Sequence, residues 1–181
     1  MQTSPFDSLS AEQREEAAAV LIDALAHAPS AWPNLVAARA EVETFLAGDE
    51  RFAIAAIESG RVQGWIGAIR QSPHAWELHP LVVRPERQGR GCGTLLVRAL
   101  EDQARAASVT TVWLGTDDDF GATNLFGADL YPNVLDRLQK LAPVGRHPFV
   151  FYRKRGYAVV GAIPDASGFG KPDILMAKRI G

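Results

Sequence analysis

Cysteine and long apolar runs are scarce in this chain. Its 181 residues include one cysteine, Cys92, which rules out a disulfide framework within the chain and is typical of a reducing compartment. No apolar run approaches the ~20 residues needed to span a bilayer. Residues 1–10 lack the basic start and apolar stretch of a signal peptide. We therefore expect a cytoplasmic protein without a membrane partner.

A strong charge of either sign is also absent. The formal net charge of −2 gives no reason to expect a nucleic acid as partner. The histidines His27, His74, His79 and His147 do not have the spacing of metal ligands, so no metal site is expected. Repeats and convincing linkers are missing too, and the length suits a single domain, residues 1–181, with a substantial core.

The most informative segment is a basic, glycine-rich turn, residues 84–93, between an apolar strand and a helix. Glycines accept unusual φ values and have no Cβ, so such a turn can direct several backbone N–H groups at one point. The helix adds its own unpaired N–H groups and the positive end of its dipole. This arrangement binds anions, most often a phosphate or pyrophosphate. Arg84, Arg87 and Arg90 add mobile positive charge.

The glycine spacing narrows the choice of ligand. A nucleoside-triphosphate loop would read GxxxxGK[ST], but Gly93 stands before Thr94 and no lysine is present. The dinucleotide fingerprint GxGxxG starts well at Gly89 and Gly91, yet its third glycine falls one place early. The spacing Q-x-x-G-x-G, from Gln88 to Gly93, resembles the acetyl-CoA pyrophosphate loop of the GNAT N-acetyltransferases. The alternative is an ordinary strand-to-helix turn rich in glycine.

The rest of the chain predicts an α+β fold with a mixed sheet. A first helix, residues 10–25, opens with a capping box of Ser10 and Gln13 and is broken by Pro29. The crossover from strand 76–83 to the next strand should be right-handed, which makes the two strands parallel neighbours. The other expected helices are residues 33–46, 93–107, 132–141 and 148–155, the last ending at Gly156 as C-cap. The expected strands are residues 52–57 and 62–69, joined as a hairpin, then 76–83, 109–114, 157–163 and 173–179.

Strand 76–83 carries a second group of polar residues. Side chains alternate along a strand, so Glu77, His79 and Leu81 share one face. An ionisable pair on a mostly apolar strand is costly to bury without purpose or partners. Pro80 lacks an N–H, which favours a bulge that leaves a neighbouring amide, such as that of Leu81, free for another partner. The alternative for Glu77 and His79 is a satisfied core or rim pair.

Several unrelated motifs follow one another in order: residues 76–83, 114–118, 129–131, 147–157 and 171–174. This series resembles the aminoglycoside 6′-N-acetyltransferases of the GNAT superfamily, specifically the dimeric chromosomal type of Gram-positive bacteria. The resemblance covers residue 51 to the C-terminus. The family begins with a strand, whereas residues 1–7 contain Pro5 and few β-branched residues, and around Trp32 only the dipeptide with Pro33 agrees.

The resemblance implies acetyl transfer from acetyl-CoA to a primary amine by direct attack in a ternary complex. It also implies a mostly antiparallel sheet with helices on both faces and a splayed parallel strand pair that holds the cofactor. Glu77, alone or with His79 through water, would orient the amine and accept its proton. The Leu81 amide would bond the thioester carbonyl. Tyr152, with an ordinary pKa of about 10, would protonate the leaving thiolate; the alternative for Tyr152 is a core aromatic.

The cofactor contacts implied by the resemblance come from the strand end, the glycine-rich turn and the tyrosine helix. Cys92, inside the turn, is expected to be a small packing residue, since a nucleophile would need a neighbouring base that the sequence does not show. The residues are Leu81, Val82, Val83, Arg87, Gln88, Gly89, Arg90, Gly91, Cys92, Gly93, Thr94, Tyr152 and Lys154.

The acceptor site should be acidic, because aminoglycosides carry several ammonium groups. Residues 117–119 are aspartates at the carboxyl end of an expected strand, where open α/β sheets commonly bind ligands. With Asp129 and Glu77 they would form an acidic cleft that attracts a polycation. The alternative is that these aspartates cap a helix or lie on a solvated loop. The expected acceptor contacts are Trp32, Glu77, Thr116, Asp117, Asp118 and Asp129.

The favoured interpretation is an acetyl-CoA-dependent N-acetyltransferase that modifies aminoglycoside 6′-amines, an antibiotic-resistance activity. Its partners would be a small polycationic amine and, from the family, a second copy in a homodimer. A polyamine, peptide or protein amine stays open as acceptor, because this fold hosts many acceptors. A non-catalytic acyl-CoA sensor is the third possibility; the presence of Glu77, His79 and Tyr152 argues against it.

Overall fold

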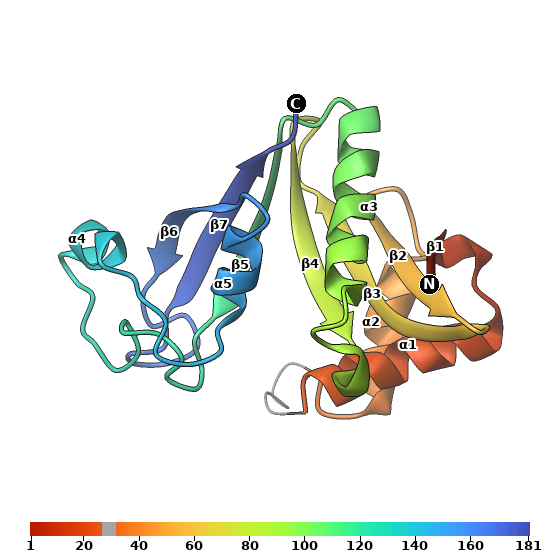
Figure 1. Ribbon diagram of the computed structural model, residues 1–181, viewed down its shortest axis with the longest axis horizontal. Coiled ribbons are helices and arrows are strands. Elements are labelled where there is room, and N and C mark those ends of the chain that lie inside the picture. Colours follow the sequence, from red (N-terminus) through yellow and green to blue (C-terminus); the bar gives the residue numbers. More distant parts are fainter. Residues whose placement is uncertain (27–31) are drawn as a thin grey trace. The chain divides into compact units, whose positions relative to one another are not determined.

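The computed structural model describes residues 1–26 and 32–181, so the expected helix break at Pro29 lies outside the described residues. The chain forms two compact units, residues 1–110 with 180–181 and residues 111–179. Each unit combines helices with antiparallel strands, which confirms the α+β class (Figure 1). A single domain over the whole chain stays a prediction.

The first unit is built on four antiparallel strands in the order β1-β2-β3-β4. They are β1 (Gln2–Pro5), β2 (Arg51–Glu58), β3 (Arg61–Arg70) and β4 (Ala75–Val83). The predicted hairpin of β2 and β3 is confirmed, with positive φ at Ser59 and Gly60.

Strand β1 corrects the expectation that the N-terminus lacks a strand. Gln2 lies opposite Ile57 and Pro5 opposite Ile54, so β1 pairs along the outer edge of β2. Pro5 is compatible with this position because it ends an edge strand, where a missing N–H breaks no ladder between two neighbours.

Helices α1 (Ala11–Ala24), α2 (Leu35–Thr44) and α3 (Cys92–Ala106) belong to the first unit, with the short 3₁₀ helices η1 (Phe6–Ser8) and η2 (Pro85–Arg87). The predicted capping box of α1 is confirmed: Ser10 Oγ accepts from Gln13 N, and Gln13 Oε1 accepts from Ser10 N. Pro33 was expected as the first residue of the second helix, but α2 begins at Leu35, because Asn34 is its N-cap: Asn34 Oδ1 accepts from Ala37 N at 3.0 Å.

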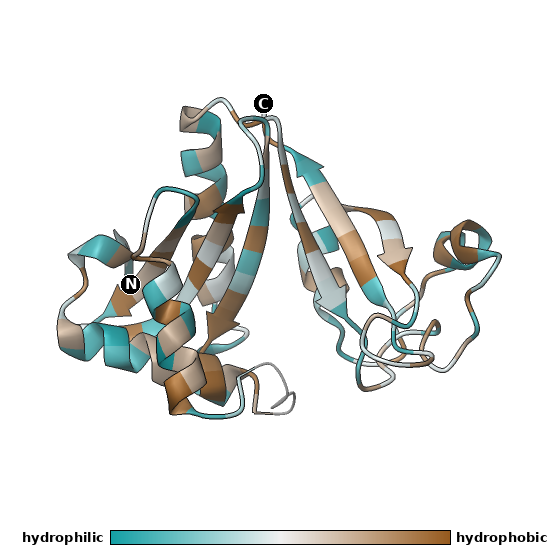
Figure 2. Ribbon diagram, turned by 180° about the vertical axis from the view of Figure 1, so that it is seen from behind, coloured by the Kyte–Doolittle hydropathy of each residue, from teal (hydrophilic) through white to brown (hydrophobic). Residues whose placement is uncertain are grey.

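The core of the first unit centres on Trp65 of β3, which has no exposed surface. Its Nε1 donates to Ala17 O of α1 at 3.0 Å, and its ring contacts those of Phe6 and Phe45. Helix α3 packs on β2, β3 and β4 as well, and the middle residues of β2 and β3 are buried on both faces. The hydrophobic residues accordingly run along these strands in Figure 2. This core holds β4 and the start of α3 in place.

The second unit has three antiparallel strands in the order β5-β7-β6. They are β5 (Thr111–Asp117), β6 (Ala158–Ile163) and β7 (Asp173–Arg179), accompanied by the short helices α4 (Val134–Gln139) and α5 (Pro148–Arg153). Helix α5 begins at its proline as expected but ends at Arg153, with Lys154 as C-cap and Gly156 beyond it at φ +87°. Helix α4 begins after Asn133, so the expected start at Pro132 is wrong.

Strand β5 also differs from the expected range, 109–114. Val109 is buried, but its N–H donates to Ala104 O at 2.9 Å and so closes the end of α3. A hydrophobic residue just past a helix end commonly makes this contact. The strand therefore starts at Thr111 and continues to Asp117, opposite Asp173 of β7.

Candidate active site

The turn between β4 and α3 adopts the conformation expected of an anion site. Gly89 and Gly91 have φ of +72° and +90°, in the left-handed region that glycine accepts most readily. A Cβ at either position would meet nothing within 4 Å, so the backbone conformation, and not crowding, favours glycine. No side chain caps α3 at its N-cap, Gly91. Backbone N–H groups at the start of this helix are thus suited to a phosphate.

Two of the three arginines in the turn are held by the protein itself. Arg84 Nε donates to Val62 O at 2.7 Å, and Arg87 Nε donates to Gln63 Oε1 at 2.8 Å. Arg87 also forms an ion pair with Glu58. The prediction of mobile charge is therefore wrong for Arg84 and Arg87, because polar groups of β2 and β3 lie within reach of both guanidinium groups. These contacts fasten the turn to the sheet.

The remaining side chains of the turn divide by exposure. Arg90 is exposed, while Gln88 Nε2 donates back to Val83 O at 3.1 Å. Cys92 is buried, and burial raises the pKa of its thiol, although the charge of Arg87 acts in the opposite direction. A buried thiol that stays protonated suits packing, as predicted, better than nucleophilic attack.

Strand β4 presents the predicted polar face. Glu77, His79 and Leu81 are half-buried, and the residues between them are buried. Gln71 Nε2 donates to Glu77 Oε2 at 2.7 Å, which orients that carboxylate. The alternation expected from the sequence is confirmed, and the ionisable pair is accessible.

The predicted bulge at Pro80 is confirmed. Ile66 of β3 lies opposite Leu81 while Ala68 lies opposite Leu78, so β4 has one residue more than β3 between these pairs. Gly67 stands in the gap, and a Cβ there would come within 2.3 Å of His79 O. The bulge thus needs a glycine on the neighbouring strand, a requirement that β4 alone does not reveal.

His79 has two neighbours from the N-terminal part of the chain. Its ring lies 5.9 Å from the ring of Trp32, and its Nε2 lies 3.9 Å from Glu41 Oε1. The structure therefore brings together two predicted site residues, Trp32 and His79. Glu41 was not predicted. A signal existed: Glu41 falls three residues after buried Ala38 and four before buried Phe45, the spacing of an apolar helix face.

Asp118 in the second unit is committed to its own loop. It is 1% exposed, and its carboxylate accepts from Ala122 N, Thr123 N and Thr123 Oγ1 at 2.6–2.8 Å. These bonds order the chain just after β5. The alternative to an acidic cleft, in which the aspartates belong to a loop, therefore agrees with the observed contacts of Asp118.

The other expected acceptor residues of the second unit differ in their exposure. Asp117 is exposed at the end of β5, and its Oδ1 accepts from Ser167 Oγ at 3.0 Å. Asp129 is exposed, and its Oδ1 accepts from Tyr131 N at 3.0 Å. Thr116 is buried. Of the expected acceptor carboxylates in this unit, Asp117 and Asp129 thus remain at the surface.

His147 fixes the start of the helix that carries Tyr152. Its Nδ1 accepts from Phe149 N at 3.1 Å, so Nε2 carries the proton of the neutral ring and donates to Asp117 O at 3.2 Å. Burial lowers the pKa of His147, against the raising effect of Asp118, and favours this neutral form. His147 is therefore the N-cap of α5.

Tyr152 is buried on α5, next to the rings of Phe151 and Tyr157. Burial raises the pKa of Tyr152 far above its usual value, and the opposing effect of Arg155 is smaller. The expectation of an ordinary tyrosine pKa is therefore wrong. The hydroxyl stays protonated and is suited to donate a hydrogen bond.

Within residues 1–26 and 32–181, no group of three or more His, Cys, Asp or Glu residues could hold a metal ion, and His27 lies outside these ranges. No helix within the same ranges is long and apolar enough to cross a bilayer.

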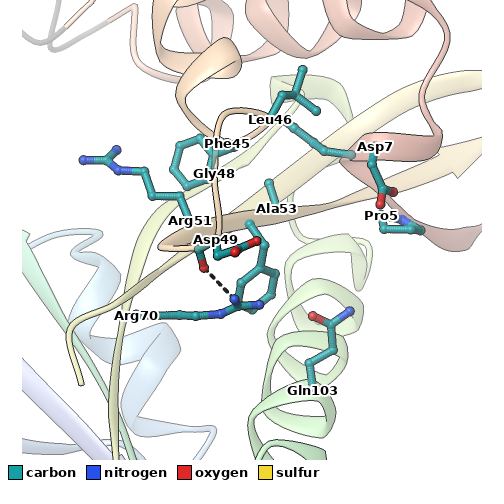
Figure 3. Close-up of a pocket in the computed structure, with 12 residues that line it drawn as sticks. Pro5, Asp7, Phe45, Leu46, Gly48, Asp49, Arg51, Ala53, Arg70 and Gln103 are labelled. Carbon is teal, nitrogen blue, oxygen red and sulfur yellow. Dashed lines mark hydrogen bonds between the residues drawn. The ribbon is translucent and has the colours of Figure 1, made fainter. Parts of the chain in front are cut away.

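One pocket of the first unit, with a volume of about 270 Å³, contains none of the predicted site residues. It lies beside η1, the start of β2 and the end of α3, and Arg70 donates to Asp49 O within it (Figure 3). The Arg70 guanidinium also lies over the rings of Phe52 and Trp76. Contacts within the protein thus account for this charged side chain.

Comparison with known proteins gave one family and several full-length relatives of known structure. The model of the acetyltransferase (GNAT) family matches residues 18–128. An aminoglycoside 6′-N-acetyltransferase complexed with coenzyme A is 37% identical over 100% of this chain and 98% of its own, with a TM-score of 0.91. The corresponding enzyme of Enterococcus faecium is 37% identical with the same coverage and a TM-score of 0.89. A type Ii 6′-acetyltransferase is 34% identical with the same coverage and a TM-score of 0.75. No match was found among curated proteins.

The full coverage corrects one expectation. The likeness does not begin near residue 51 but includes the N-terminal residues, among them β1, α1 and α2. Residues before 51 therefore belong to the shared fold, and Glu41 and Trp32 with them.

Proposed function

Because the chain belongs to the acetyltransferase (GNAT) family, we propose that it transfers the acetyl group of acetyl-CoA to the 6′-amine of an aminoglycoside. The observation that carries this proposal is the 37% identity, over the whole chain, to an aminoglycoside 6′-N-acetyltransferase complexed with coenzyme A. The geometry of the β4–α3 turn and the polar face of β4 support the same reaction. Acetyl-CoA is the cofactor, as the turn predicts.

The first unit fits the diphosphate of the cofactor. The start of α3 has no side-chain cap, and left-handed Gly89 and Gly91 precede it with open space around both. Arg90, exposed beside them, adds charge. When bound, acetyl-CoA supplies an activated acetyl group. The residues that would hold it are Leu81, Val82, Val83, Arg87, Gln88, Gly89, Arg90, Gly91, Cys92, Gly93, Thr94, Tyr152 and Lys154.

Glu77 takes the central role with the acceptor amine. Its carboxylate, oriented by Gln71, holds the incoming ammonium group and accepts a proton from it, alone or with His79 through water. The uncharged amine then has the lone pair that attack on a carbonyl requires. The Leu81 amide, next to the bulge at Pro80, stabilises the negative charge that develops on the carbonyl oxygen.

Tyr152 assists the departing sulfur with a hydrogen bond. The raised pKa makes its hydroxyl a weaker acid than an ordinary tyrosine, so hydrogen bonding to the sulfur is more favourable than complete proton transfer. Holding the two reactants in place supplies much of the remaining rate.

Acidic side chains attract the acceptor. Glu77, Asp117 and Asp129 are accessible and offer negative charge to the several ammonium groups of an aminoglycoside. Trp32 and Thr116 border the acceptor. Asp118 contributes indirectly, because its carboxylate is occupied in ordering the loop that follows Asp117.

The proposal also includes a homodimer, a cytoplasmic location and a role in antibiotic resistance. Exposed Val160 and Ile163 on β6, the edge strand of the second unit, support a homodimer by offering apolar surface to a second copy. The requirement for acetyl-CoA supports a cytoplasmic location, where that cofactor is produced. Resistance to aminoglycosides is the proposed role.

Thiol release from acetyl-CoA tests the proposal. The purified chain should release coenzyme A rapidly with kanamycin and slowly with spermidine or a basic peptide. Faster release with spermidine or with the peptide would show that this amine, and not the aminoglycoside, is the substrate. Saturable acetyl-CoA binding without release for any amine would identify a sensor instead.

A further inference from the structure

A row of four side chains connects β2, α2 and β4 in the first unit. Arg51 Nη1 lies 3.5 Å from Glu41 Oε1, and the same Glu41 oxygen lies 3.9 Å from His79 Nε2. Trp32 is the last member of the row, and its ring lies 5.9 Å from the His79 ring. All four residues belong to the first unit.

Glu41 has a fixed place in this row. Its side chain is 18% exposed, a low value for a carboxylate, and Arg51 holds it on one side. Arg51 is itself held by Thr44 Oγ1 at 3.3 Å and lies over the Phe45 ring. In Figure 3 the Arg51 guanidinium extends away from Asp7 and Gln103, which line the pocket. Arg51 and Glu41 thus form an ion pair beside His79.

The position of Glu41 selects one tautomer of His79. A carboxylate near Nε2 favours a proton on that nitrogen, which leaves the Nδ1 lone pair as the acceptor of the neutral ring. The 3.9 Å separation is longer than a hydrogen bond, so the interaction is electrostatic in this structure. Catalytic hydrogen bonds of unliganded enzymes often shorten when the substrate binds.

We propose that Glu41 is a positioning residue that keeps His79 in the tautomer with Nε2 protonated, so that Nδ1 receives the proton of the acceptor amine. This inference rests on the proposed acetyl transfer, and of the two routes given there for the amine proton it takes the route through water to His79. An ammonium acceptor gives one proton to water, and that water gives one to Nδ1, which leaves a free amine and an imidazolium. The amine nitrogen then bonds to the acetyl carbon as the carbon–sulfur bond breaks, and the proton that this nitrogen loses on forming the amide passes to the departing thiolate. His79 returns its proton to solvent after the product leaves.

Charged groups near His79 come from three elements. Glu41 approaches from α2, Glu77 shares its face of β4, and Arg51 of β2 stands behind Glu41. Gln71 orients the Glu77 carboxylate through Oε2, and Glu77 is only half-buried, so the ammonium group can reach it. The two carboxylates thus divide the work: Glu77 contacts the acceptor, and Glu41 acts through the imidazole.

The first test is a double-mutant cycle. Glu41→Gln should lower kcat by about 10-fold, less than the ~100-fold or more expected for loss of a base itself, with an unchanged KM for acetyl-CoA. In a His79→Ala background the same change should have no further effect. Glu43→Gln, an exposed change of equal charge on the same helix, is the control and should match wild type. An equal loss in both backgrounds would overturn the proposal.

The second test needs no turnover. In ¹⁵N-histidine NMR spectra at about pH 8, where an ordinary histidine is neutral, His79 should show a protonated Nε2 and an unprotonated Nδ1. Glu41→Gln should give a mixture of tautomers, and Glu41→Asp, which keeps the charge, should restore most of the wild-type signal. Identical spectra for wild type and Glu41→Gln would refute the inference. If the wild type acetylates no amine, the proposed function fails independently of this spectrum.

Discussion

Arg87 of the glycine-rich turn forms an ion pair with Glu58, the last residue of β2. The two residues are far apart in sequence, and their pairing fastens the turn to the hairpin. Arg87 Nε also donates to Gln63, so the guanidinium is held from two sides. The turn is thereby shaped before a ligand arrives, and a preformed site loses less entropy on binding.

Removing Glu58 should therefore loosen the turn. Glu58→Gln is expected to raise the Kd for acetyl-CoA about 3- to 10-fold, a loss of ~0.7–1.4 kcal/mol, and to leave kcat nearly unchanged. Isothermal titration calorimetry with acetyl-CoA measures this. Glu50→Gln, an exposed carboxylate just before β2, is the control. A wild-type Kd for Glu58→Gln would show that the ion pair does not shape the site.

Gly91 and Gly48 offer a matched pair of left-handed glycines. Their φ values are +90° and +91°, and a Cβ at either would meet no atom within 4 Å. Alanine at either position should reduce stability by ~1–2 kcal/mol. Only Gly91→Ala should weaken acetyl-CoA binding, because only Gly91 directs N–H groups at the start of α3. Equal affinity in both variants would argue against the diphosphate site.

Tyr152→Phe should lower kcat about 10- to 100-fold and change acetyl-CoA affinity little, because the hydroxyl acts on the departing sulfur. Since burial raises its pKa, the hydroxyl stays protonated below and around the usual value of about 10. Ionisation of Tyr152 should therefore not lower the wild-type kcat up to about pH 9.5. Over this range kcat of the wild type and of Tyr152→Phe should depend on pH in the same way. An unchanged kcat in the variant would exclude Tyr152 from the mechanism.

Asp118→Asn and Asp117→Asn should change different properties, stability in the first case and the KM for the acceptor in the second. The buried Asp118 carboxylate accepts three hydrogen bonds, so its replacement should lower stability by ~1.5–3 kcal/mol. Asp117 is exposed, and its replacement should raise the KM for kanamycin several-fold with an unchanged Tm. Thermal unfolding and steady-state kinetics of the two variants distinguish these outcomes. A stable Asp118→Asn with a raised KM would instead place Asp118 at the acceptor.

Features set by neighbours along the chain could be predicted from the sequence. The Ser10–Gln13 capping box and the β2–β3 hairpin turn each depend on a few adjacent residues, and both are confirmed. Pro80 likewise indicated the bulge in β4, although the glycine that the bulge requires, Gly67, lies on the neighbouring strand. The glycine-rich turn belongs to this class, since spacing alone places its glycines before α3.

Features that depend on distant pairing were missed. Strand β1 exists because the edge of β2 accepts it, and Arg87 is held by Glu58 and Gln63 of other elements. The approach of Glu41 to His79 likewise joins α2 to β4. Sequence patterns report local geometry, and such contacts arise only when the sheet is assembled.

The most direct test of the account is the product formed from kanamycin and acetyl-CoA. Mass spectrometry and NMR should find one added acetyl group, on the 6′ nitrogen, and an aminoglycoside with a hydroxyl at that position should give no product. Acetylation at another amine would contradict the assigned acceptor. No acetylated product, despite saturable binding of acetyl-CoA, would contradict the proposed reaction.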